Sequence, residues 1–171
     1  MGNKVPERLI NYNCYADSSK LVGLVDAELP KPESYSEEVS GAGIAGAYET
    51  PTIGHFKPMT VKLNFRTATS QFAQLLQPRM HLLEFRSALQ VQDSGTGTME
   101  QKGYQVTLQA IPKGPDFGKL EVGKPTGDSF EMEVLYMNVI YDGIEIVMID
   151  KANFVYRVNG VDYLKGVRDL I

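Results

Sequence analysis

The chain has 171 residues, 43% hydrophobic and 22% charged, with a formal net charge of −4. This length fits one domain with a sizeable core, and the acidic balance argues against a general nucleic-acid binder, which would present a basic field. A single cysteine excludes an intrachain disulfide and a thiolate metal cluster. No apolar run approaches the roughly 20 residues that span a bilayer, and residues 1–6 are too polar for a secretory signal.

The N-terminal third gives a mixed pattern. Residues 9–16 and 21–28 are two extended stretches, and they predict a hairpin around Asp17-Ser18-Ser19-Lys20. Residues 30–56 contain prolines, glycines and the acidic pair Glu37-Glu38, and they predict a long loop. Because apolar residues are scattered through this segment, we expect it to order against another chain.

Four stretches alternate apolar and polar residues and predict long antiparallel strands, each with one buried and one polar face. The apolar positions are Met59, Val61, Leu63 and Phe65; then Leu83, Phe85, Ser87, Leu89 and Val91; then Tyr104, Val106, Leu108 and Ala110; and last Phe130, Met132, Val134 and Tyr136. Several of these strands exceed ten residues, whereas a typical strand has about five or six.

Turn and cap signals separate these stretches. Asp142-Gly143 predicts a two-residue turn that joins residues 129–141 to 144–150, and Asn159-Gly160 predicts another after residues 154–158. Thr69 predicts the cap of a short helix that Pro78 ends. Asp162 predicts the cap of a C-terminal helix with Tyr163, Leu164, Val167, Leu170 and Ile171 at helical spacing. Residues 112–127, rich in proline and glycine, predict a second long loop.

No pattern points to catalysis. Residues 41–46 match G-x-G-x-x-G, but a polar lead-in and Pro51 replace the strand and helix that dinucleotide binding needs. His55 and His81 lack metal-ligand neighbours and predict structural roles, and Cys14 predicts a small core thiol. We therefore expect no catalytic, cofactor-binding or metal site, no cofactor, and a protein that is not an enzyme.

Several segments together resemble a known family. They are Ser40-Gly41-Ala42-Gly43-Ile44-Ala45-Gly46, Pro51-Thr52-Ile53-Gly54-His55-Phe56, Leu63-Asn64-Phe65-Arg66-Thr67, Arg86-Ser87-Ala88-Leu89-Gln90-Val91, Gly118-Lys119-Leu120-Glu121-Val122-Gly123, Ile149-Asp150-Lys151-Ala152-Asn153-Phe154 and Val158-Asn159-Gly160-Val161-Asp162-Tyr163-Leu164. In this order and spacing they resemble the major tail tube protein family of contractile-tailed phages and related phage-tail-like bacteriocins. The resemblance covers nearly the whole chain, from about Leu9 to the end.

The resemblance implies a single tail tube domain over residues 1–171. Its fold would be mainly β, with two packed antiparallel sheets curved into a barrel-like sandwich and one or two short flanking helices. Six subunits would form a ring, and stacked rings would form a hollow conduit for genome delivery inside a contractile sheath. The implied partners are the sheath, baseplate, tail terminator and tape measure proteins, and DNA transiently in the lumen, without a membrane. The protein would assemble in the bacterial host cytoplasm and reside in the virion tail.

Two sets of site residues follow from combining the patterns with the resemblance. Inter-subunit candidates in the two loops, at about 30–56 and 112–127, are Gly41, Gly43, Ile44, Gly46, Tyr48, Ile53, His55, Phe56, Phe117 and Leu120. Lumen-facing candidates are Lys62, Asn64, Arg66, Glu84, Arg86, Gln90, Gln92, Gln105, Thr107, Gln109, Glu131 and Glu133. A mixed or acidic lining would avoid holding phosphates.

Three alternatives stay open. The chain could form the tube of a headless contractile bacteriocin or of another contractile injection system, or it could resemble the type six secretion tube. A small β-barrel ligand carrier or enzyme is the alternative from another class, and it requires an apolar pocket with converging polar groups.

Overall fold

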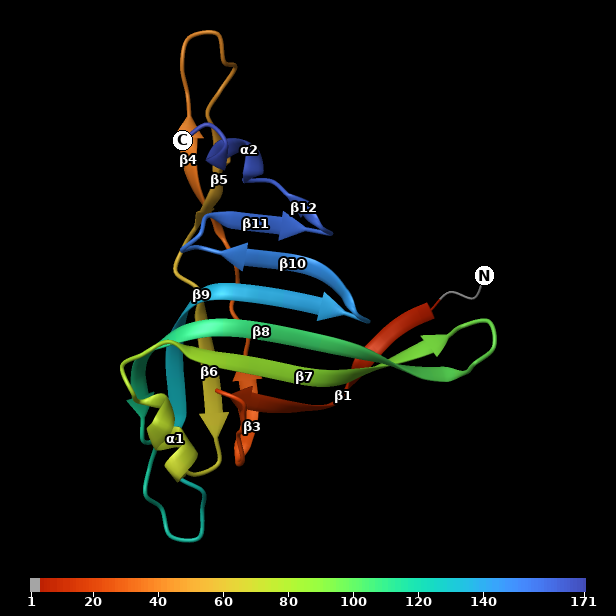
Figure 1. The fold of residues 1–171 in the computed structure, drawn as a ribbon, viewed down its shortest axis with the longest axis vertical. Coiled ribbons are helices and arrows are strands. Elements are labelled where there is room, and N and C mark those ends of the chain that lie inside the picture. Colours follow the sequence, from red (N-terminus) through yellow and green to blue (C-terminus); the bar gives the residue numbers. More distant parts are fainter. Residues whose placement is uncertain (1–3) are drawn as a thin grey trace.

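Residues 4–171, the part that this computed structural model describes, contain twelve strands and two short helices (Figure 1). In chain order they are β1 (Lys4–Ala16), β2 (Ser19–Lys20), β3 (Leu24–Glu28), β4 (Ser34–Val39), β5 (Tyr48–Phe56), β6 (Thr60–Phe65), α1 (Ser70–Leu75), β7 (His81–Asp93), β8 (Met99–Asp116), β9 (Ser129–Tyr141), β10 (Ile144–Asp150), β11 (Val155–Val158), β12 (Val161–Asp162) and α2 (Lys165–Arg168). The predicted mainly β class is confirmed.

One bent antiparallel sheet of ten strands forms both layers of the fold. Its main path is β12-β11-β10-β9-β8-β7-β1-β2, and β6 and β3 branch from β9. Strand β9 pairs with β8 along its length, whereas its other side pairs with β6 up to Glu133 and with β10 from Tyr136 onward. The larger layer therefore runs across the molecule and the smaller layer, β3 and β6 with the first half of β9, runs steeply to it (Figure 1). The two predicted layers are present, but the sheet does not close into a barrel.

A β-bulge at Leu135 makes this bend. Ala110 pairs with Val134 and Gln109 pairs with Tyr136, so Leu135 has no partner on β8. An extra residue bends a strand and reverses the side-chain alternation after it. Val134 is fully buried and Met137 is only 4% exposed, whereas Tyr136 lies on the polar face. The prediction that Tyr136 continues the buried series was wrong for this reason.

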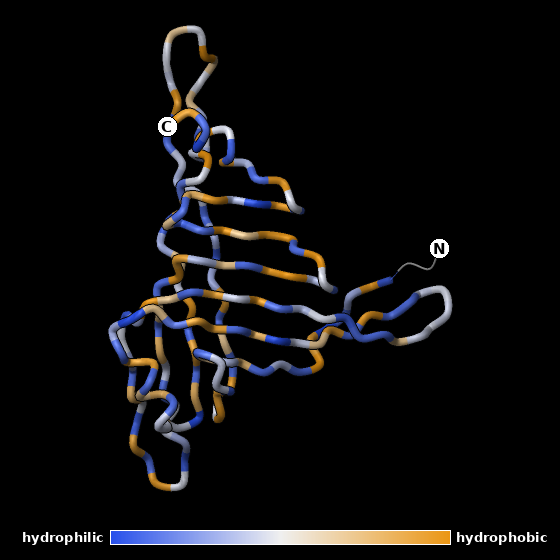
Figure 2. Tube along the Cα trace, viewed as in Figure 1, coloured by the Kyte–Doolittle hydropathy of each residue, from blue (hydrophilic) through white to orange (hydrophobic). Residues whose placement is uncertain are grey.

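The core lies between the two layers. Buried side chains from the smaller layer are Met59, Val61, Leu63, Phe65 and Met132, and those facing them include Leu83, Phe85, Val106, Leu108 and Ala110. Phe72 of α1 fills the flank, with edge-to-face ring contacts to Phe65 at 5.2 Å and to Phe130 at 5.7 Å. Burying one such side chain stabilises the fold by about 1.5–3 kcal/mol. Figure 2 shows the alternating hydropathy along the long strands that produces this core.

Both predicted Asn/Asp-Gly turns are confirmed. Asp142, Gly143, Asn159 and Gly160 all have positive φ, between 49° and 80°, as a type I′ hairpin turn requires. The turn at residues 142–143 joins β9 to β10 with the predicted bounds.

The two predicted helices have different outcomes. The Thr69 hydroxyl accepts a hydrogen bond from Phe72 N, so the predicted cap of α1 is confirmed, and the helix ends before Pro78. The C-terminal helix is only four residues long, and Leu170 and Ile171 are 88% and 92% exposed. The Asp162 carboxylate accepts a hydrogen bond from Leu164 N at 3.0 Å and another from the Arg168 guanidinium. It therefore does not cap a long helix.

Three strand and loop predictions were wrong in detail. The turn at Asp17-Ser18 leads only into the two-residue β2, because β3 pairs with β6 instead of β1. Most of residues 30–56 is the hairpin β4–β5, in a sheet of its own. Residues 112–116 belong to β8, so the second loop is shorter than expected.

Candidate assembly surfaces

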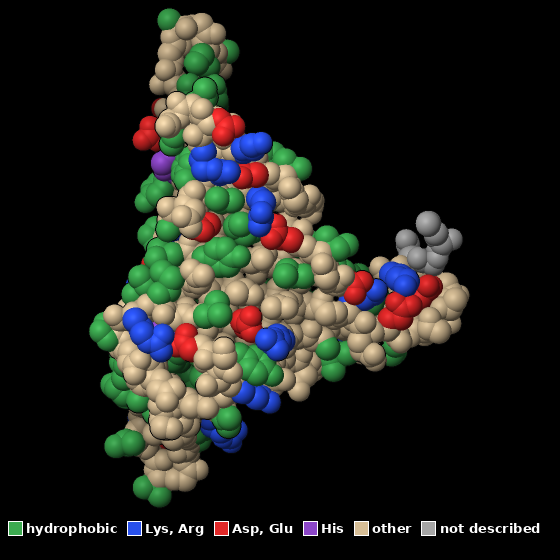
Figure 3. Space-filling view, in the orientation of Figure 1, with side chains coloured by type: hydrophobic (Ala, Val, Ile, Leu, Met, Phe, Trp, Pro, Cys, Tyr) green, Lys and Arg blue, Asp and Glu red, His purple; other side chains and the backbone are tan. Residues whose placement is uncertain are grey.

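The larger layer has a polar outer face rich in uncharged amides. Gln90, Gln105, Thr107 and Gln109 lie on it, opposite the buried Leu83, Phe85, Val106 and Leu108 in the register of β7 and β8. Asn138 of β9 pairs with Thr107 and extends this face. We call this surface the amide face, and Figure 3 shows it toward the viewer.

The charges on the amide face occur in pairs of opposite sign. Arg86 lies 2.7 Å from Glu84 and its guanidinium sits over the Tyr15 ring at 4.7 Å. Arg157 contacts Glu145 at 3.1 Å. Figure 3 accordingly shows blue groups next to red groups, with uncharged surface between one pair and the next. Because Glu84, Arg86, Glu145 and Arg157 each have a neighbour of opposite sign, these four charges together present little net field to a passing anion.

The smaller layer has an outer face that is much more charged. Lys62, Glu131 and Glu133 lie there, and an open cleft of about 570 Å³ between Lys31, Lys57, Lys62, Glu28, Glu33 and Glu131 runs along it. Lys57 pairs with Glu33 at 3.2 Å and Lys151 with Glu133 at 3.4 Å. We call this surface the charged face.

The lumen-facing candidates divide between these two surfaces. Glu84, Arg86, Gln90, Gln92, Gln105, Thr107 and Gln109 belong to the amide face, whereas Lys62, Asn64, Arg66, Glu131 and Glu133 belong to the charged face or adjoin it. Both layers direct their apolar sides to the common core, so their polar sides point in opposite directions. The candidates therefore form two groups on opposite surfaces of the subunit.

A wing of three strand segments extends past the smaller layer. The N-terminal half of β1 and the tip of the β7–β8 hairpin form it (Figure 1). Within residues 4–171, β1 pairs with β7 on one side, but its other side meets only β2 at Tyr15 and Ala16. Residues 4–13 therefore present an open sheet edge, and Val5, Leu9 and Ile10 on it are about half exposed. An edge of this length is a site for pairing with another chain.

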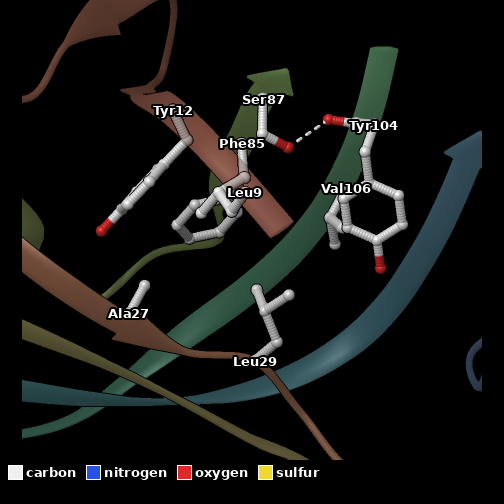
Figure 4. A pocket seen from close by; sticks show the side chains of 8 residues that line it. All are labelled: Leu9, Tyr12, Ala27, Leu29, Phe85, Ser87, Tyr104 and Val106. Atoms are coloured by element: carbon white, nitrogen blue, oxygen red, sulfur yellow. Dashed lines mark hydrogen bonds between the residues drawn. The ribbon is translucent and has the colours of Figure 1, made fainter. Parts of the chain in front are cut away.

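An apolar groove lies where the wing meets the sandwich (Figure 4). Its volume is about 110 Å³, and it is lined by Leu9, Tyr12, Ala27, Leu29, Phe85, Ser87, Tyr104 and Val106. Burial raises the pKa of Tyr104, and burial followed by the nearby Asp26 and Cys14 raises that of Tyr12. Both phenols are therefore neutral in ordinary conditions, and the groove is an uncharged surface.

The β4–β5 hairpin projects alone from the upper end of the molecule (Figure 1). Tyr48 and Ile53 are 54% and 67% exposed, and Ile44 in the connecting turn is 40% exposed. An isolated two-stranded hairpin is at best marginally stable in water. Gly41, Gly43 and Gly46 lie in the turn, in open space, whereas Phe56 packs on Tyr156 of its own chain at 5.2 Å. The glycine-rich motif thus connects two strands, without the helix that a nucleotide site needs.

The loop at residues 117–127 projects from the opposite end of the molecule, the teal segment in Figure 1. Gly118 has φ +66° and lies so close to the Thr126 carbonyl that a Cβ would be 2.0 Å from its oxygen. Lys119 N also donates to the Thr126 carbonyl, so the base of the loop is fixed. Leu120 and Val122 beyond it are fully exposed, at 89% and 103%. Phe117 contacts Phe72 at the base.

The remaining chemically active side chains serve the fold. His81 is fully buried between the Asp17 carboxylate at 2.8 Å and the Gln77 carbonyl at 3.1 Å. Burial raises the pKa of Cys14 to about 12. Among residues 4–171 no three His, Cys, Asp or Glu side chains are placed to hold a metal ion. In the same residues no helix has the length and apolar character to cross a membrane.

Comparison with known families decides the identity. The family model of the phage tail tube protein FII matches residues 6–171. The chain belongs to the phage tail tube FII family. A curated tail tube protein of Escherichia phage P2 is 30% identical to this chain over 86 residues. These residues are 50% of this chain and 48% of the phage P2 protein. The match therefore spans about half the length of that relative. Proteins of this family are structural tube subunits.

Solved structures share the tail tube fold. The sheath/tube terminator of an extracellular contractile injection system, PVC in its extended state, aligns with a TM-score of 0.54 at 12% identity, over 80% of this chain and 96% of that one. A chain of the PVC sheath–tube complex in its extended state aligns with a TM-score of 0.52 at 10% identity, over 80% and 90%. At these identities the likeness concerns the fold alone.

Sequence reasoning missed part of the surfaces of this tail tube family chain. Contacts by the N-terminal arm and covered sheet edges were expected, but the assignment of the open edge to β1 and the groove beside it were not, because a strand pattern does not tell which strand lies at the border of a sheet. Val122 was also missed, although its place beside Leu120 in a polar loop was a usable signal.

Proposed function

We propose that this chain is the subunit of the inner tube of a contractile phage tail. Six copies form a ring and stacked rings form a hollow conduit for the genome inside the sheath, in the virion tail. The observation that carries this proposal is the sheet that remains open at residues 4–13 in a chain of the tail tube family. Head-to-tail pairing of open edges around an axis gives a closed ring.

The amide face is proposed to line the channel. Each lysine–phosphate contact releases counterions and adds affinity for DNA, so a conduit needs few unpaired cations. Arg86 and Arg157 have carboxylate neighbours, and the other polar groups between them are mostly amides. The lumen candidates that we retain are Glu84, Arg86, Gln90, Gln92, Gln105, Thr107 and Gln109.

The charged face is proposed to point outward to the sheath protein. Lys62, Glu131 and the cleft beside them offer charges of both signs to a partner. Such a surface sets the register and specificity of a contact more than its affinity. Baseplate, terminator and tape measure proteins are proposed as further partners at the tube ends and in the lumen.

The ligand-carrier alternative receives little support from the geometry. The apolar groove has a volume of about 110 Å³, while small-molecule sites usually have about 300–1,000 Å³. Its lining is also continuous with an open sheet edge, as expected for a surface that a second copy covers.

Electron microscopy of the purified chain tests the proposal. We expect hollow tubes of uniform width. Ile10→Glu, which places a charge on the open edge, should abolish tubes and leave a folded monomer, since Ile10 is 50% exposed in the subunit. Val22→Glu is the matched control, because Val22 is 63% exposed and lies off this edge. Shortening residues 40–56 should likewise stop assembly and preserve the fold.

A monodisperse monomer at every concentration tested would contradict the proposal. Tubes formed by Ile10→Glu as readily as by the unmodified chain would contradict the role of the β1 edge. Circular dichroism of each variant separates failed assembly from failed folding.

A further inference from the structure

We propose that the β4–β5 hairpin of one subunit binds the loop at residues 117–127 of a second copy in the next ring. This inference rests on the proposed tube function and names the contact that stacks the rings. Both elements project from the molecule, at opposite ends of its long axis (Figure 1). When two different surfaces of identical copies bind each other and each copy is shifted along an axis, the contact repeats from copy to copy and forms an open stack. Stacked rings require such a contact.

The hairpin carries an acidic cluster that its own chain does not neutralise. Residues 34–56 contain Glu37, Glu38 and Glu49 and neither lysine nor arginine. None of the three forms an ion pair within the described residues 4–171. Glu38 also lies directly opposite Glu49 in the strand register. Like charges in this position destabilise a strand pair, so the hairpin is more stable beside a cation.

The loop at the other end carries the complementary charge. Residues 117–127 contain Lys119, Lys124 and one acidic residue, Glu121. Glu121 is 2.6 Å from Lys124 and 3.8 Å from Lys119, so two ammonium groups share one carboxylate. The lysine side chains are 83% and 64% exposed. Within residues 117–127 the lysines therefore outnumber the acidic residues by one, and the exposed Asp116 at the base of the loop accepts a hydrogen bond from Gly118 N.

Apolar side chains accompany the charges at both ends. Leu120 and Val122 are fully exposed on the loop, and Ile44 and Tyr48 are 40% and 54% exposed on the hairpin. Exposed apolar groups with a polar rim mark protein contacts. Opposite charge around an apolar centre fixes which end meets which, because contact between two hairpins would bring glutamates together.

Charge reversal tests the pairing. The unmodified chain should form tubes, and Glu37→Lys with Glu38→Lys should reduce the sedimenting tube fraction by about tenfold or more, as should Lys119→Glu with Lys124→Glu. All four substitutions in one chain should restore tubes. Lys20→Glu with Lys102→Glu is the matched control for the Lys119 and Lys124 variant, because it makes the same change in net charge outside the hairpin and the loop. Added salt should weaken stacking of the unmodified chain and not that of a cross-linked one.

A cysteine pair gives a second measurement that does not depend on charge. Ile44→Cys with Val122→Cys should yield, on oxidation of tubes, a ladder of covalent chains longer than six. The native Cys14 is 2% exposed and adds no background.

The outcomes separate the two proposals. If the unmodified chain forms no tubes, the proposed function fails. If tubes form, three results would contradict the hairpin-to-loop contact and leave the tube function standing. Both reversed variants assemble normally, the fourfold variant stays folded but unassembled, or the ladder of cross-linked chains is absent or stops at six.

Discussion

At the scale of single residues, the buried His81 and the partly exposed Asp17 form a pair that holds two distant segments together. Both ring nitrogens of His81 face acceptors, a carboxylate and a carbonyl. The Asp17 carboxylate also accepts hydrogen bonds from Leu82 N at 2.9 Å and from the Arg79 guanidinium at 2.7 Å. These bonds tie the β1–β2 turn to the start of β7, two segments far apart in the chain.

Asp17 should contribute an acid-sensitive part of the stability. Its partial burial alone would raise the pKa, but the hydrogen bonds from Leu82, His81 and Arg79 outweigh burial and lower the pKa below its usual value. A lowered folded-state pKa adds stability above the unfolded-state value, near 3.8, and this stability is lost as pH falls through the folded-state pKa. Urea unfolding from pH 7 to pH 2 should therefore show a shallower acid loss for Asp17→Asn. Equal slopes for both chains would refute this.

Cys14 should be chemically silent in the folded subunit. With the pKa raised to about 12 by burial, only about one thiol in ten thousand is ionised at pH 8, and the thiolate is the reactive form. A maleimide reagent should label Cys14 slowly in buffer and rapidly in urea. Fast labelling of the native chain would show that β1 opens at this position.

At the scale of elements, Gly54 positions the β4–β5 hairpin. It has φ +79°, and a Cβ there would lie 2.6 Å from Leu164, which is 1% exposed beside α2. The register of the hairpin also shifts between Ser34 and Ser36, so the hairpin bends near this contact. Gly54 therefore sets the direction in which the hairpin projects.

Gly54→Ala should displace the hairpin without unfolding the sheet. Strain of this kind costs about 1–3 kcal/mol, and we expect faster hydrogen exchange in residues 48–56 together with shorter or fewer tubes. Gly114→Ala is the control, since Gly114 lies outside the hairpin, has open space and has no positive φ. Similar exchange and assembly for both variants would mean that the contact has no role.

The elements also show what the sequence can predict. Alternation predicted the long strands, because one face of each strand is buried in its own chain. The Asp-Gly and Asn-Gly dipeptides predicted the two turns, because they tolerate positive φ. The bulge could not be found, since Val134, Leu135, Tyr136 and Met137 are all apolar and hide the change of phase. Strands β4 and β5 escaped prediction because neither face of this hairpin is buried, so no hydrophobic period marks it.

At the scale of the whole molecule, the two polar faces could be listed from sequence but not separated. Alternation assigns Lys62 and Gln105 equally to polar sides, and only the bend in the sheet places them on opposite surfaces. The proposal that the amide face lines the channel therefore keeps only one of the two groups of lumen-facing candidates.

Selective labelling should distinguish these faces in assembled tubes. Gln105→Cys should be shielded from a maleimide carrying a large polymer, because the reagent cannot enter a long channel, whereas Lys62→Cys should react. Both should react in dissociated subunits, which provides the control. Preferential labelling of Gln105→Cys would exchange the inner and outer surfaces.

The continuity of β9 has a mechanical consequence. Since the first half of this strand pairs with β6 and the second half with β10, a push on the outer surface reaches the channel wall through covalent backbone. Under the same load, two separate sheets would slide over one another at their apolar interface. A tube built from such subunits should resist crushing and torsion while the surrounding machine moves.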